Sequence, residues 1–118
     1  FVATFIGEAN LLPGHRKAGQ VTLEAGPAFA NTGADGPVTT VVRPKAVRLL
    51  RADEKADIEI SGDLTEVVYL GDHIKCVMAV SDRQDVVVHL DVSVSPRPVV
   101  GEQARLGWSL QQQRVVSA

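Results

Sequence analysis

A run of alternating apolar and polar residues between Asp57 and Val92 constrains the fold of this chain most. Alternation with a period of two is the pattern of a β-strand that buries one face. Gly71 and Asp72 interrupt it as a two-residue turn, because glycine accepts the positive φ that tight hairpins require. A second polar turn follows at 81–84. The apolar rows are Ile58, Ile60, Leu64, Val68 and Leu70, then Ile74, Cys76, Met78 and Val80, then Val86, Val88, Leu90 and Val92. We therefore expect three consecutive antiparallel strands that share one buried face.

One residue of the first row does not fit this pattern, because Glu66 falls on the apolar side. A β-bulge near Gly62 or Glu66 would turn the carboxylate outward. Bulges also bend sheets towards closure into barrels. The misfit therefore predicts a bulge and a curved sheet.

The remainder of the chain shows further short strands separated by turns. We expect strands at 11–12, 21–23, 38–42, 47–49 and 104–110. We expect turns at Pro13-Gly14 and Ala18-Gly19, an exposed loop at 26–36, a charged connection at 51–57 and a frayed tail at 111–118. Apolar spacing at 1–6 favours one or two turns of helix. About seven short antiparallel strands with almost no helix predict an all-β sandwich or small barrel.

Composition excludes several classes of protein. A length of 118 residues suits one domain, and a hydrophobic content of 45% favours folding over disorder. The net charge of −2 argues against nucleic-acid binding. The single cysteine, Cys76, excludes an internal disulfide and fits a reducing compartment. No apolar run approaches the roughly 20 residues of a membrane-spanning helix.

The residues available for catalysis do not form a recognisable site. His15, His73 and His89 lack metal-ligand spacing with one another or with Cys76. Asp72 lies beside His73, but in a tight turn this pairing is typical of solvated polar residues. The chain has no phosphate-binding loop motif. We therefore predict that this fragment is not an enzyme and holds no metal or cofactor.

Two features are candidates for binding. Arg43, Lys45, Arg48 and Arg51 cluster around a proline, where they would receive an anion or a partner's carboxylates, or form a solvated edge. Trp108 lies on an apolar row, which indicates either core packing or an anchor in an interface. Aromatic residues make up only 4% of the chain, so no base-stacking platform emerges.

Four segments, in order along the chain, resemble one known family. These are FVATFIGEANLLPG at 1–14, VVRP followed by VRL at 41–49, GDLTEVVYLG at 62–71, and the closing strand from Gly101-Glu102 to Trp108. Together they resemble the transport-associated OB (TOBE) domain, the C-terminal regulatory domain of the ATP-binding subunit of bacterial ABC importers. The polyamine (spermidine/putrescine) and ferric-iron importers are the most similar types.

The resemblance implies an organisation, a location and partners. Residues 1–118 would be one OB-like regulatory domain, with 1–7 a remnant of the linker from a preceding ATPase domain, 38–56 a connecting segment and 57–110 the main meander. ATP and Mg²⁺ would bind only to the ATPase domain. The partners of the regulatory domain would be the ATPase domain of the same chain, the twin ATPase subunit in a homodimer, and the membrane permease subunits. The protein would be cytoplasmic and peripheral on the inner face of the bacterial inner membrane.

Three functional hypotheses follow. The leading one is a non-catalytic regulatory and dimerisation domain of an importer of a small solute. The second is a sensor of a small ligand, either an oxyanion or a polyamine, that regulates the ATPase. The third is an OB-type oligonucleotide-binding module, which the acidic pI and scarce aromatics disfavour. The residues expected to contact a partner or ligand are Glu8, Asn10, Arg43, Arg48, Asp72 and Trp108.

Overall fold

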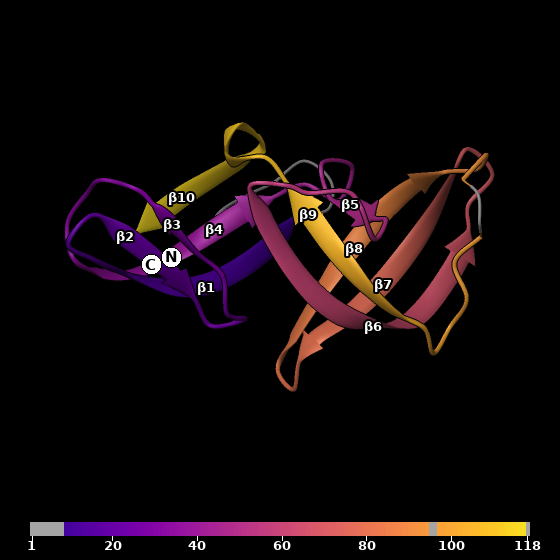
Figure 1. Cartoon of the computed structure of the whole chain (residues 1–118), viewed down its shortest axis with the longest axis horizontal. Coiled ribbons are helices and arrows are strands. Elements are labelled where there is room, and N and C mark those ends of the chain that lie inside the picture. The colour runs from indigo at the N-terminus through magenta and orange to yellow at the C-terminus, as the bar shows by residue number, and fades with distance from the viewer. Residues whose placement is uncertain (1–8, 95–96, 118) are drawn as a thin grey trace.

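The computed structural model describes residues 9–94 and 97–117 and consists of two antiparallel sheets side by side (Figure 1). Each sheet has five strands, and the described residues contain one 3-10 turn and no longer helix. None of the described residues belongs to a helix that is long and apolar enough to cross a membrane. The all-β antiparallel class is confirmed, whereas the expected number of about seven strands is too low. The helical turn predicted at 1–6 lies outside the described residues.

The sheets are assembled from segments that are distant in the sequence. The first sheet has the strand order β10-β4-β1-β2-β3 and the second has the order β5-β9-β6-β7-β8. The first contains β1 (Asn10–Lys17), β2 (Gln20–Leu23), β3 (Ala28–Ala30), β4 (Gly36–Val42) and β10 (Gln113–Ser117). The second contains β5 (Arg48–Leu50), β6 (Ile58–Tyr69), β7 (His73–Ser81), β8 (Gln84–Asp91) and β9 (Gln103–Trp108), and the 3-10 turn η1 (Leu110–Gln112) follows β9.

One of the two turns predicted near the start of the first sheet is absent. Ala18 and Gly19 both have positive φ and join β1 to β2, as expected. Pro13 and Gly14, however, lie inside β1 rather than in a turn. The β1–β2 register ends at Gly14, and beyond it the Pro13 carbonyl accepts a hydrogen bond from the Glu24 N–H at 3.0 Å. Pro13 pairs with Thr39 of β4, but its nitrogen lies on the β2 side of the strand, as its carbonyl does. Proline is tolerated there because the missing N–H would lie beyond the last paired residues of the β1–β2 ladder.

Two segments expected to be irregular are strands of the first sheet. The predicted loop at 26–36 contains β3, whose central residue Phe29 is buried. The predicted frayed tail forms η1 and then β10, which pairs with β4 from Gln113↔Val42 to Ser117↔Val38. A three-residue strand is too short to show a period. The pairing of β10 with β4 joins residues about 70 positions apart, which local pattern does not reveal.

The predicted bulge is present in β6 and changes which residues face the core. The β6–β7 register passes from Leu64↔Met78 to Glu66↔Val77, so Thr65 is the additional residue. Glu66 is exposed, which confirms the prediction. Because one extra residue reverses the alternation, Val67 packs against the core. The predicted continuation of the row through Val68 and Leu70 is therefore wrong, and Leu70 is 49% exposed.

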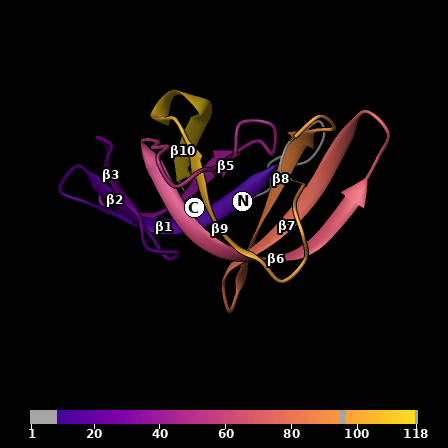
Figure 2. The same ribbon diagram turned by 45° about the vertical axis from the view of Figure 1, so that its right-hand side comes forward.

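The second sheet curls into a half-barrel whose two edge strands, β5 and β8, face each other. Figure 2 shows β6 bending along its length between β9 and β7. One apolar core runs through both sheets. Its fully buried large side chains include Leu12, Leu23, Ile58, Ile74, Met78, Leu106 and Trp108.

The edge strand β8 is joined to the first sheet by a side chain rather than by another strand. The buried Asn10 of β1 accepts a hydrogen bond from the Val87 N–H at 2.7 Å and donates one to the Val87 carbonyl at 2.8 Å. Two residues further along β8, the His89 N–H donates a hydrogen bond to the Pro44 carbonyl at 3.1 Å. These bonds satisfy part of the exposed edge of the half-barrel, which otherwise would be a template for another chain.

Candidate functional site

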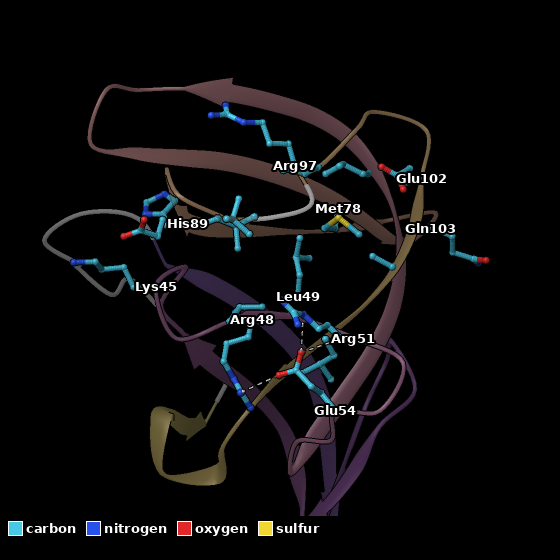
Figure 3. Close-up of a pocket in the computed structure, with 18 of the residues that line it drawn as sticks. Lys45, Arg48, Leu49, Arg51, Glu54, Met78, His89, Arg97, Glu102 and Gln103 are labelled. Carbon is cyan, nitrogen blue, oxygen red and sulfur yellow. Dashed lines mark hydrogen bonds and ion pairs between the residues drawn. The ribbon is translucent and has the colours of Figure 1, made fainter.

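A cavity of about 750 Å³ opens where the half-barrel does not close, and we call it the seam cavity (Figure 3). It lies between β5 on one side and β8 with the following segment on the other. The wall formed by β5 and the segments on either side of it contributes Lys45, Val47, Arg48, Leu49, Leu50, Arg51, Asp53 and Glu54. The facing walls contribute Leu64, Met78, His89, Leu90, Asp91, Val94, Arg97, Pro98, Glu102, Gln103 and Ala104.

The floor of the seam cavity is apolar. Leu64 and Met78 are buried in the core behind it, and the half-buried Leu49 projects from β5 towards Met78 (Figure 3). Eight of the residues that line the cavity are charged, four of them basic and four acidic. The cavity is therefore apolar at its floor and mixed in charge around its rim.

The rim of the cavity formed by residues 48–54, which is the lower rim in Figure 3, carries a cluster of charged side chains. Arg48 and Arg51 both approach the Glu54 carboxylate, each with a nitrogen–oxygen distance of 4.0 Å. Glu54 also accepts a hydrogen bond from the Arg51 backbone N–H at 3.0 Å. All three side chains are substantially exposed, so these ion pairs contribute little to stability.

Arg105 holds this rim in place from beneath. Its guanidinium donates hydrogen bonds to the carbonyls of Arg51, Ala52 and Glu54 and forms an ion pair with Glu59. The pKa of Glu59 is lowered, first by the hydrogen bond from the Ala56 N–H and then by the Arg105 guanidinium. The backbone of residues 51–54 is therefore held in place by Arg105.

A second, shallower depression of about 560 Å³ lies across the ends of β4 and β10, and we call it the cationic groove. It contains three basic side chains and three amides, and no carboxylate is among its lining residues. The lining consists of Val41, Arg43, Lys45, Ala46, Gln111, Gln112, Gln113 and Arg114. Such a set of donors without acceptor carboxylates favours an anion.

The residues predicted from the sequence to contact a ligand or partner are dispersed. Arg43 lies in the cationic groove and Arg48 on the rim of the seam cavity, and Lys45 lines both. Asp72 lies in the β6–β7 turn, where its carboxylate contacts His73 Nδ1 at 2.7 Å. This hydrogen bond lowers the pKa of Asp72. Glu8 lies outside the described residues.

The other two predicted contacts are buried. Asn10 bonds Val87, as described above, and Trp108 is fully buried with its indole N–H donating to Gln113 Oε1 at 2.8 Å. Of the two interpretations that the sequence left open for Trp108, the structure shows core packing. Neither side chain is accessible to a partner here, so any role in recognition would act through the positions of neighbouring strands.

The side chains that were candidates for catalysis do not lie together in one site. Among residues 9–94 and 97–117, no three His, Cys, Asp or Glu side chains are arranged to hold a metal ion. Cys76 is buried, and burial raises the pKa of its thiol. The rings of His73 and His89 on adjacent strands lie against each other with their centroids 4.5 Å apart and their planes tilted by 45°. These contacts support the half-barrel.

Sequence reasoning identified the basic cluster at 43–51 but not the seam cavity beside it. The cavity combines β5 with Met78, Asp91, Arg97 and Glu102, which come from four separate stretches. The curling of the second sheet brings these stretches together. The predicted bulge indicates a curved sheet, but no local pattern in the sequence indicates which stretches the curvature brings together.

Comparisons with known proteins agree with the resemblance described above. The chain is 31% identical over 123 residues to the spermidine/putrescine import ATP-binding protein PotA of Rubrobacter xylanophilus. That alignment covers 92% of this chain but only 31% of the relative, so the chain spans about a third of the relative's length. The fold is similar to that of the cytoplasmic molybdate-binding protein ModG with molybdate bound, with a TM-score of 0.77 at 12% identity over 92% of this chain and 96% of ModG.

A model of the TOBE domain matches residues 40–116, which include the end of β4, the whole second sheet and most of β10. That match extends over well more than half of the chain, and it includes the segments at 41–49, 62–71 and 101–108 that carry the resemblance in sequence. This chain therefore belongs to the TOBE domain family.

Proposed function

We propose that this chain is the non-catalytic regulatory and dimerisation domain of the ATP-binding subunit of a bacterial ABC importer. The observation that carries the proposal is the 31% identity across 92% of the chain to an import ATP-binding protein. By this proposal the imported solute is a polyamine, as in the name of that relative. The parent protein works on the cytoplasmic face of the membrane, attached to its permease subunits, and its ATPase domain binds ATP and Mg²⁺.

The gene itself provides the most direct test. We expect the reading frame upstream of Phe1 to encode a phosphate-binding loop motif, because the proposal places an ATPase domain there. An upstream frame that encodes no nucleotide-binding motif would contradict the importer assignment. Uptake of labelled spermidine by cells carrying the parent gene then tests the solute, with uptake of an unrelated solute as the control.

The first sheet offers a surface for dimerisation. Its outer face carries Leu11, Pro13, Thr39 and Val116, which are cross-strand neighbours on β1, β4 and β10, with the exposed Arg114 at one end of the same face beside the buried Val41. Leu11 is 47% exposed. Apolar surface of this kind on a sheet face is typical of contacts between subunits.

Sedimentation velocity at increasing concentration tests this surface. We expect the wild-type chain to self-associate, and Leu11→Lys or Val116→Lys to shift it towards monomer because each places a charge on the contact face. Leu70→Lys, at an exposed apolar residue of the β6–β7 turn, is the matched control and should associate as the wild type does. A wild-type chain that remains strictly monomeric at high concentration contradicts the dimerisation proposal.

A second function is favoured by the cationic groove and by the likeness to a molybdate-binding fold: sensing of a small oxyanion that regulates the ATPase. A ligand at one hundred times its Kd stabilises the folded state by about 2.7 kcal/mol. Thermal unfolding with molybdate or sulfate should therefore show a rise in Tm that Arg43→Met with Arg114→Met abolishes. Stabilisation by spermidine instead would favour the polyamine-sensing form of this hypothesis, and no stabilisation by any of these ligands would remove both.

A further inference from the structure

We draw no further inference here: the strongest candidate, the seam cavity between β5 and β8, carries four basic and four acidic side chains around a floor whose Leu64 and Met78 are already buried, and nothing in the structure shows what would occupy it.

Discussion

At the scale of single residues, Asn10 contributes more to the fold than its polar character suggests. It lies on β1 of the first sheet, is buried, and exchanges two hydrogen bonds with the backbone of Val87 on β8. A side-chain amide reproduces the donor and acceptor of a backbone peptide. It thus replaces one residue of a neighbouring strand where the two sheets meet.

Substitution of Asn10 should lower the free energy of unfolding, and the size of the loss should depend on the hydrogen-bonding groups of the new side chain. Asn10→Ala should lower the free energy of unfolding by about 2 kcal/mol, since it leaves two buried backbone groups of Val87 unpaired. Asn10→Asp retains an acceptor at neutral pH but donates to the Val87 carbonyl only when protonated. Burial raises the pKa of such a carboxyl, so this variant should gain stability, relative to the wild type, as the pH falls below about 5. Urea unfolding at pH 4 and pH 7 measures the stability of both variants. An Asn10→Ala protein as stable as the wild type would show that the bonds to Val87 do not stabilise the fold.

Substitution of Thr40 should have the opposite effect and raise stability. Its hydroxyl oxygen is buried in the core without a hydrogen-bond partner in the described structure. Thr40→Val keeps the shape and removes an unsatisfied polar group, so it should raise the free energy of unfolding by about 1 kcal/mol. Thr39→Val, at the neighbouring residue on the outer face, is the control and should change stability little. A destabilised Thr40→Val protein would show that the hydroxyl has a partner.

At the scale of elements, one residue in β6 decides how the second sheet curves. Thr65 is the extra residue of the bulge, and its hydroxyl donates to the Val77 carbonyl at 3.1 Å. Before it Leu64 faces the core, and after it Val67 does, so the polar Glu66 remains in water. Without the bulge, a strand of this length would place a carboxylate on the buried row.

Deletion of Thr65 should therefore be far more damaging than its substitution. The deletion forces either Glu66 into the core or a one-residue slip of the strand, and we expect a loss of about 3 kcal/mol or more. Thr65→Ala should cost only about 1 kcal/mol, because it keeps the backbone count and loses one exposed hydrogen bond. Thermal unfolding by circular dichroism compares the two. Equal Tm values would mean that the bulge does not determine the register.

At the scale of the whole molecule, three carboxylates tie stability to pH. The pKa values of Glu59, Asp72 and Asp91 are all lowered by hydrogen bonds: from the Ala56 N–H and Arg105, from His73, and from Ser93 respectively. A group with a lowered folded-state pKa stabilises the protein above its unfolded pKa and loses that contribution as the pH falls. We therefore expect stability to be constant near neutrality and to decline below about pH 4. Glu59→Gln should flatten part of this decline, whereas replacement of the exposed Asp82 should not. An unchanged Glu59→Gln profile would contradict this assignment.

Local pattern was sufficient for much of this fold. Alternation predicted the three strands of the meander, and two-residue turns were correctly placed at Ala18-Gly19 and Gly71-Asp72. A single carboxylate on an apolar row predicted the bulge. Each of these depends on residues within a few positions of one another, where steric preference and burial act directly on the chain.

Other features of the fold depend on pairings between distant segments. β10 completes the first sheet beside β4, Asn10 meets Val87, and the seam cavity assembles β5 with residues about 50 positions further along. The sequence alone determined an all-β chain with a bent central meander and a basic segment at 43–51. The division of that basic segment between a cationic groove and a cavity rim arose from the curling of the second sheet. The bulge at Thr65 indicates that the sheet bends. Contacts between distant segments decide which residues the bend brings together, and no short stretch of sequence encodes those contacts.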